Sequence, residues 1–264
     1  MSTVNCIFFH FPGLPNVGCA FQTRSLPAPA DPLTADADPL AGGNISHSVG
    51  ADPDGTVRSR RALTELLRPQ GAAAWAELHQ VHGNALHFDP PAVPFAAAPA
   101  LTDADLPEGD GLATDRPGLA LCIKTADCQP ILLAHQSGRH IAALHAGWRG
   151  NRCAFPADGA RRFCEHYGLD PREVLAVRGP SLGPDNAQFV NFDQEWGPDY
   201  APWLDAANHT MDLWSLTRRQ LKDAGLLPRH IFGLDLCTMT NPQFFSYRRQ
   251  RRCGRQASLI WIKA

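Results

Sequence analysis

Three short apolar runs, each bounded by turn residues, limit the fold of this chain more than any other feature. They occupy residues 118–123, 130–134 and 140–144. Their length is typical of β-strands rather than helices. The turn Ser137-Gly138 separates the last two runs, so they are candidates for the two strands of one hairpin. A sheet protein is therefore expected.

Further strands and helices follow from periodicity and from turn and cap residues. Strands are predicted at residues 75–82 and 85–88, on either side of the Gly83-Asn84 turn, and at 174–177, 231–236 and 258–262. Helices are predicted at 56–67, at 153–167 with Gly168 as the stop, and at 213–224 between the cap Asp212 and Gly225.

The order of these elements predicts the fold class. Strands and helices are mixed without strict βαβ alternation, and no repeat or linker divides the chain. We expect an α+β fold: a single domain, residues 1–264, of mixed β-sheets with flanking helices. Residues 25–43 and 90–100 are rich in Pro and Ala and are expected to be surface loops.

Composition narrows the classes of partner. The formal net charge of −2 gives no support to a nucleic-acid-binding surface. No run approaches the roughly 18 apolar residues that span a bilayer. No Lys or Arg precedes Arg24, as a secretory signal would require, and the eight cysteines include no C-x-x-C pair. We expect a cytoplasmic protein with reduced thiols that binds neither membrane nor nucleic acid.

Three segments place a metal-binding side chain at the end of a predicted strand. They are H-Q-V-H-G (79–83), T-A-D-C-Q-P (125–130) and H-A-G-W-R-G (145–150). If residues 130–134 and 140–144 pair as a hairpin, Cys128 and His145 fall at the same open end, and His82 joins them if its strand is a neighbour. Two His and one Cys suit zinc and leave a fourth position open. A metal-free thiolate–imidazole pair, or two core histidines and a buried thiol, are the alternatives.

The chain resembles the laccase-domain (YfiH-like) family of purine nucleoside phosphorylases. The resemblance rests on motifs that occur in the family's order from about residue 44 to the C-terminus: N-I-S-H-S-V-G (44–50), Q-V-H-G (80–83), T-A-D-C-Q-P, H-A-G-W-R-G, G-P-S-L-G-P (179–184), F-F-S-Y-R-R (244–249) and G-R (254–255). It implies that His82, Cys128 and His145 are zinc ligands and catalytic residues. His79 is not carried over.

The resemblance also implies activity and partners. We expect a zinc-dependent purine nucleoside phosphorylase that uses phosphate with adenosine, inosine, guanosine and methylthioadenosine, and that also deaminates adenosine. Copper is expected to bind the same site in vitro, because copper binds most N/S sites more tightly than zinc. One Cys and two His without any H-x-H pair argue against a true multicopper oxidase. The competing hypotheses are an amide hydrolase acting on peptidoglycan precursors, a polyphenol oxidase-like copper activity, and a metal-binding protein without turnover.

Five further residues are candidates for the substrate site: Asn44, Arg60, Asp127, Arg149 and Arg248. Arg60 is a candidate phosphate ligand, although Ser59 and Ala51 depart from the family's usual Asn and Asp; a solvated arginine on the helix surface is the alternative. Asn44 is expected to contact ribose or to stabilise a turn. Asp127 is expected to accept a hydrogen bond from the second ring N–H of a metal-bound His, or to bond to backbone. Arg149 is expected to pack or pair near the site, and Arg248, with Tyr247, to border the pocket.

Overall fold

The apolar runs form the centres of two mixed β-sheets in the computed structural model, which describes residues 4–24 and 40–264. Within these residues the first sheet has six strands in the order β1 (Asn5–Phe8), β2 (Val17–Thr23), β14 (Gln256–Ile262), β7 (Leu119–Thr125), β3 (Ala74–Ala76) and β5 (Val93–Pro94). The second has the order β13 (Ile231–Gly233), β10 (Val174–Arg178), β8 (Gln129–His135), β9 (Ile141–Ala146), β6 (Gly111–Thr114) and β4 (Leu86–Phe88).

The two sheets pack face to face over a shared core, which explains why their strands are apolar on both sides. In β7, Leu119, Leu121 and Ile123 belong to the core between the sheets, together with side chains from β8 and β9. Ala120 and Cys122 point to the other face of the first sheet and pack under a helix. Successive side chains of a strand alternate between faces, so a strand covered on both sides loses its polar positions.

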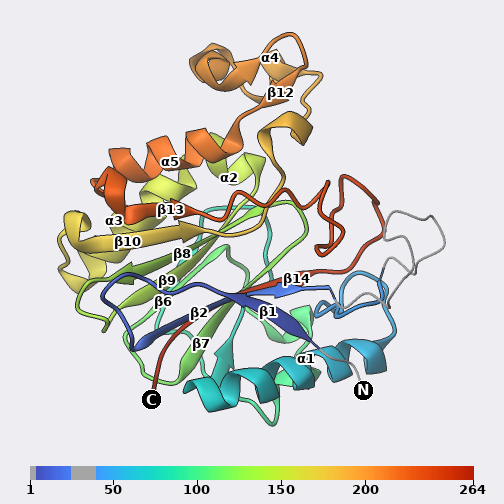
Figure 1. Ribbon diagram of the computed structural model, residues 1–264, viewed down its shortest axis with the longest axis vertical. Coiled ribbons are helices and arrows are strands. Elements are labelled where there is room, and N and C mark those ends of the chain that lie inside the picture. Colours follow the sequence, from blue (N-terminus) through green and yellow to red (C-terminus); the bar gives the residue numbers. More distant parts are fainter. Residues whose placement is uncertain (1–3, 25–39) are drawn as a thin grey trace.

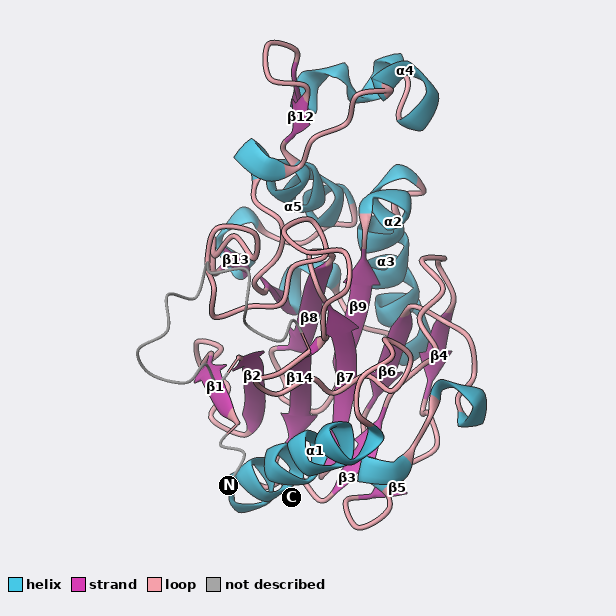
Figure 2. Ribbon diagram, turned by 90° about the vertical axis from the view of Figure 1, so that its right-hand side faces the viewer, coloured by secondary structure: helices cyan, strands magenta, loops and turns pink. Residues whose placement is uncertain are grey.

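Helices cover the two outer faces, so the molecule has helix, sheet, sheet and helix layers (Figure 1). Helix α1 (Pro53–Leu67) packs on the first sheet, and its N-cap Asp52 accepts hydrogen bonds from the N–H groups of Asp54 and Gly55. Helices α3 (Phe155–Tyr167) and α5 (Leu213–Asp223) cover the second sheet. Strand β9 leads directly into α2 (Trp148–Arg152) (Figure 2).

A smaller lobe extends beyond α5 in Figure 1. It contains α4 (Phe192–Glu195) and the two-stranded sheet of β11 (Leu204–Asp205) and β12 (Thr210–Met211). Its own apolar cluster includes Phe189, Trp196 and Met211. Among the described residues, no helix has both the length and the apolar character needed to span a membrane.

The structure confirms the predicted fold class and most predicted elements, with several differences. The strand predicted at 75–82 ends at Ala76, because the chain turns away there and buries Glu77 against Arg60. The strand predicted at 231–236 ends at Gly233, and β1, β2 and β6 were not predicted. Residues 90–100 include β5 and bury Phe95 and Ala98, while residues 25–39 of the other expected loop lie outside the described residues.

Candidate metal centre

The side chains of His82, Cys128 and His145 lie together at one end of the second sheet. Their candidate ligand atoms are all within 4.8 Å of one another. His82 Nε2 is 3.7 Å from Cys128 Sγ, and the centroids of the two imidazole rings are 4.8 Å apart. His145 is buried, Cys128 is half-buried and His82 is exposed. The cluster therefore reaches solvent on the side of His82.

The β8–β9 hairpin brings Cys128 and His145 together, as the spacing of the two apolar runs predicted. Antiparallel register pairs Gln129 with Ala146 and Pro130 with His145. Cys128 directly precedes β8, so its thiol stands at the same end of the hairpin as the His145 ring. His82 arrives on the loop that follows β3, whose parallel neighbour is β7, the strand that leads towards Cys128. The contact of three distant segments is thus a consequence of sheet topology.

Two positions show how closely these segments approach one another. A Cβ on Gly147 would lie 2.8 Å from Cys128 Sγ and 3.2 Å from His82 Cδ2, so only glycine fits in the H-A-G-W-R-G turn. His82 itself has φ of 61°, in the left-handed region that non-glycine residues seldom adopt. Such strain at a clustered side chain is typical of a functional position.

A carboxylate absent from the predicted site, that of Asp110, bonds to the ring of His145 and to the backbone of His82. Its Oδ1 accepts hydrogen bonds from His145 Nδ1 at 2.7 Å and from the His82 N–H at 3.0 Å, and its Oδ2 accepts one from the Gly83 N–H at 2.6 Å. Burial alone would raise the pKa of Asp110, but the hydrogen bond and charge of His145 and the two N–H groups lower it. Because Nδ1 of His145 is occupied, Nε2 is left for a ligand.

Cys128 and His145 form a thiolate–imidazolium pair. Burial alone would raise the pKa of the Cys128 thiol, but the charge of His145 and hydrogen bonds from both imidazoles lower it to about 6. Burial would lower the pKa of His145, but the charge of Cys128 and the hydrogen bond to Asp110 raise it to about 9. The thiol is therefore ready to act as a metal ligand or a nucleophile near neutral pH.

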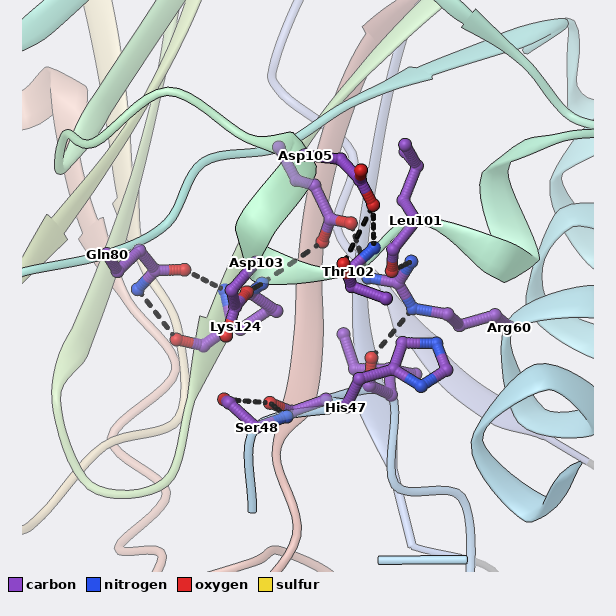
Figure 3. A network of polar contacts seen from close by, with 12 residues as sticks. His47, Ser48, Arg60, Gln80, Leu101, Thr102, Asp103, Asp105 and Lys124 are labelled. Carbon is purple, nitrogen blue, oxygen red and sulfur yellow. Dashed lines mark hydrogen bonds and ion pairs between the residues drawn. The ribbon is translucent and has the colours of Figure 1, made fainter. Parts of the chain in front are cut away.

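A polar network beside the cluster fixes the loop that carries His82 (Figure 3). The Gln80 amide makes two hydrogen bonds with the backbone of Lys124, donating to its carbonyl at 2.8 Å and accepting from its N–H at 2.7 Å. Lys124 Nζ lies 2.8 Å from Asp103 and 3.4 Å from Glu77. These contacts join the Q-V-H-G segment to the end of β7, four residues before Cys128.

Arg60 belongs to the same network and is not open to a ligand. It is 2% exposed and its guanidinium pairs with the buried carboxylate of Glu77. It also donates to the carbonyl oxygens of Ile45, Ala98 and Leu101. The expectation of a phosphate ligand at Arg60 is therefore not supported, and the structure places it as a link between α1 and the surrounding loops.

Asn44 is likewise occupied by the protein. Its Nδ2 donates to the Ser46 carbonyl and to Thr56 Oγ1, and its Oδ1 accepts from the N–H groups of Ser46 and Arg255. It is 3% exposed. Of the two expected roles, these bonds match the stabilisation of a turn rather than a contact with ribose.

Asp127 and Arg248 are brought together, but not in the way expected for Asp127. The Asp127 carboxylate accepts hydrogen bonds from Thr238 Oγ1 at 2.7 Å and from the Arg248 N–H at 2.6 Å. The partner of the His145 ring is Asp110 instead. Asp127 thus matches the expected backbone-bonded role, and it connects the residue before Cys128 to the F-F-S-Y-R-R segment.

Arg149 and Arg248 are the two predicted site cations that reach the surface. Arg149 is exposed, two residues after Gly147, with its guanidinium 4.4 Å from the ring centroid of Trp148. Arg248 is exposed, and its Nη1 donates to the Gln188 carbonyl at 3.1 Å. Arg149 belongs to the turn whose Gly147 lies against Cys128, and Arg248 belongs to the segment that bonds to Asp127.

A buried amide network holds the turn after His145 against α5. Asn151 Nδ2 donates to Thr217 Oγ1 at 2.7 Å and to Gln220 Oε1 at 3.1 Å, and Asn151 Oδ1 accepts from Gln129 Nε2 at 2.9 Å. Gln220 Nε2 returns a hydrogen bond to the Asn151 carbonyl. The residue that follows Cys128 and the helix that follows Gly147 are thereby fixed to each other. Neither Asn151 nor Asp110 was predicted; an Asp between two glycines at the start of a short apolar run is the one signal for Asp110.

The donor set fits a metal ion with nitrogen and sulfur preference. Imidazole nitrogen and thiolate are zinc donors, and three protein ligands leave a position for another group. Asp110 bonds to Nδ1 of His145, which is the arrangement that orients metal-binding histidines in many proteins. The cluster can therefore hold a metal, and without one it presents a thiolate beside an imidazolium.

Fold and donor set together define a two-sheet protein with a candidate three-ligand metal centre at a hairpin end. The chain belongs to the family described as multi-copper polyphenol oxidoreductase laccase, whose model matches residues 33–263. The resemblance indicated by the sequence motifs is thereby confirmed.

Named relatives cover most of the chain. It is 36% identical over 236 residues to a purine nucleoside phosphorylase of Xylella fastidiosa, covering 85% of each chain. It is 30% identical over 228 residues to the purine nucleoside phosphorylase YfiH of Escherichia coli, covering 83% of this chain and 86% of that one. The crystal structure of YlmD from Geobacillus stearothermophilus matches with a TM-score of 0.78 and 26% identity, covering 96% and 94% of the two chains.

Proposed function

We propose that this protein is a zinc-dependent purine nucleoside phosphorylase that acts on adenosine, inosine, guanosine and methylthioadenosine, and that also deaminates adenosine. One observation carries the proposal. Two imidazoles and a thiol place their ligand atoms within 4.8 Å of one another, in a chain whose relatives over most of its length are named purine nucleoside phosphorylases.

His82, Cys128 and His145 would hold the metal, with His145 coordinating through Nε2 because Asp110 occupies its Nδ1. When bound by three protein ligands, zinc supplies Lewis-acid stabilisation of negative charge at its open position. Copper would occupy the same donors in vitro, because its affinity for N/S sites exceeds that of zinc.

The two exposed cations would serve phosphate. In phosphorolysis the C1′–N9 bond of the nucleoside breaks, a C1′–O bond to phosphate forms, and the purine leaves after protonation. Phosphate must be held beside C1′ while this happens, and guanidinium groups match its charge and geometry. Arg149 and Arg248 are exposed on the segments next to Cys128 and take this role in the proposal.

Three other predicted residues take different parts. The proposal gives Arg60 and Asn44 no contact with the substrate, because their side chains are buried and bonded to the protein. Asp127 is a positioning residue, because its carboxylate connects the chain before Cys128 to Arg248.

The test is phosphate-dependent turnover of inosine, followed as hypoxanthine and ribose 1-phosphate, with and without a chelator. We expect product that requires phosphate, disappears on chelation and returns with zinc. Cys128→Ala should abolish this reaction and adenosine deamination together, whereas Cys153→Ala, at an exposed cysteine, serves as the matched control. Loss of only one activity in Cys128→Ala would reject a shared site, and turnover that survives complete metal removal would reject the zinc requirement.

A second function is favoured by the ionisation of Cys128. A thiolate beside an imidazolium is also the nucleophile pair of Cys–His hydrolases, and it would attack an amide carbonyl without a metal. Release of product from a muramyl peptide, insensitive to chelator and with nucleosides inert, would support an amide hydrolase instead. No turnover of either substrate, with zinc bound, would leave a metal-binding protein.

The proposal includes a cytoplasmic location. All eight cysteines fall within the described residues, and each is unpaired. Free thiols in this number suit a reducing compartment. Fractionation of cells that express the protein from its own chromosomal locus tests this location. We expect the activity in the cytoplasmic fraction, and activity in the periplasmic fraction would contradict the proposal.

A further inference from the structure

The F-F-S-Y-R-R segment forms a rigid loop with two exposed residues at its tip. Phe244, Phe245 and Ser246 are at most 1% exposed. The Gln256 side chain bonds to both the N–H and the carbonyl of Phe245. On the other side of the tip, the Arg249 guanidinium donates to the backbone carbonyls of residues 238, 239, 241 and 244. Between these anchors, Tyr247 is 46% exposed and Arg248 is also exposed.

The tip is fastened next to Cys128. The Arg248 N–H donates to Asp127 Oδ2 at 2.6 Å, and Asp127 directly precedes Cys128. Asp127 has φ of 98°, a conformation unusual for a residue other than glycine. Backbone strain of this kind persists only where the surrounding structure enforces it. Here the Asp127 carboxylate points to the two loops that carry Thr238 and Arg248. Tyr247 is therefore the sequence neighbour of a residue that bonds directly to the segment of the metal centre.

Exposed apolar side chains occur on the segments that carry, or bond to, residues of the candidate site. Within the described residues, the large hydrophobic side chains that remain exposed are Phe8, Val81, Val190 and Tyr247. Val81 precedes the candidate ligand His82, and Val190 follows by two residues the Gln188 carbonyl that accepts from Arg248. Only Phe8, on the edge strand β1, lies apart from these segments. Large apolar side chains left exposed beside polar groups are typical of a ligand-binding surface.

We propose that Tyr247 is the platform on which the purine base of the substrate stacks, and so a substrate-positioning residue for the phosphorylase proposed above, on which this inference rests. A phenol ring stacks on any purine, whatever its exocyclic groups, because every base presents a π-face. Arg251, 5.9 Å from the Tyr247 ring centroid, helps to fix the ring. Because the loop is anchored on both sides, the ring is oriented before the base arrives and little ordering entropy is lost on binding.

The proposal predicts that removal of the Tyr247 ring weakens binding of the purine base and leaves the binding of phosphate and zinc unchanged. Tyr247→Leu should weaken hypoxanthine binding to the zinc-loaded protein and raise KM for inosine by about tenfold, within the range of about 5- to 150-fold for one stacking contact. KM for inorganic phosphate and zinc content should stay within about twofold of the wild type. Tyr247→Phe keeps the ring and should behave as the wild type. Phe8→Leu, at another exposed aromatic residue, is the matched control.

Hypoxanthine titration by calorimetry separates this inference from the proposed function. If the wild type does not convert inosine but binds hypoxanthine, and only Tyr247→Leu loses that binding, the stacking role stands and the phosphorylase proposal fails. If Tyr247→Leu binds hypoxanthine as the wild type does, or if Tyr247→Phe loses as much as Tyr247→Leu, the stacking role is wrong. Absence of hypoxanthine binding by the wild type overturns it as well.

Discussion

Asp110→Asn should weaken zinc binding by about 10- to 100-fold while leaving the fold intact. The carboxylate accepts three hydrogen bonds: from the N–H groups of His82 and Gly83 and from His145 Nδ1. Asparagine has the same shape, but one of its two terminal atoms donates. An Nδ2 group at the Oδ2 position faces the Gly83 N–H, and at the Oδ1 position it faces the other two donors. Either orientation therefore sets a donor against a donor.

Two estimates of the loss in zinc-binding free energy agree. Loss of a hydrogen bond to a charged group costs about 1.5–3 kcal/mol. Removal of the carboxylate that orients a metal-binding histidine costs about 10- to 100-fold in affinity or activity, which is about 1.4–2.8 kcal/mol. Because Asp110 touches both candidate histidine ligands, we expect the upper half of this range.

The assay is competition for zinc between the protein and a chromophoric chelator of known affinity. Asp115→Asn is the matched control, because Asp115 directly follows β6, the strand that Asp110 precedes, and is exposed. Its zinc affinity should equal that of the wild type, and circular dichroism of both variants should show the wild-type secondary structure. A folded Asp110→Asn protein that binds zinc as tightly as the wild type would refute the role assigned to this carboxylate.

Three further predictions concern the same end of the sheets. Gly147→Ala should abolish stoichiometric zinc binding, measured by elemental analysis, since its Cβ would lie 2.8 Å from Cys128 Sγ; a fully zinc-loaded variant contradicts this. Between pH 6 and 9 the metal-free thiol–imidazole pair holds one proton, on His145, which zinc must displace. Zinc affinity should therefore rise about tenfold per pH unit and level off above pH 9. Chelator competition at several pH values measures this, and a zinc affinity that does not change across this range would contradict it. Asn151→Ala should lower the free energy of unfolding by about 1–3 kcal/mol in urea titrations, because it removes the side-chain partner of the buried Gln129 Nε2 and Gln220 Oε1; an unchanged midpoint contradicts it.

The hairpin and its consequence could be predicted because they depend on local sequence. Two apolar runs joined by a short turn pair with each other, and the residues just outside them must then meet. Cys128 and His145 are such residues, and the register of β8 and β9 places them at one end. The third candidate ligand, His82, could be included only on the condition that its strand is a neighbour, and the strand expected to carry it ends at Ala76.

Other parts of the site depend on contacts between segments that are distant in the sequence, and the sequence gives weaker signals for them. Asp110 reaches His145 because β6 pairs with β9, a pairing that no spacing in the sequence reveals. Arg60 lies at helical spacing from the buried Leu63 and Leu67, so its position on the inner face of α1 was readable. Its partner Glu77 was not, because that residue is buried only after the chain leaves β3. A buried arginine and a phosphate ligand therefore could not be distinguished before the fold was known.

Anomalous scattering at the zinc edge, from crystals of the zinc-loaded protein, tests the central claim most directly. We predict one strong peak bonded to His82 Nε2, Cys128 Sγ and His145 Nε2, at about 2.0–2.1 Å from nitrogen and about 2.3 Å from sulfur, with a fourth position free of protein atoms. Zinc bound elsewhere, or at this place without the thiolate, would contradict the account.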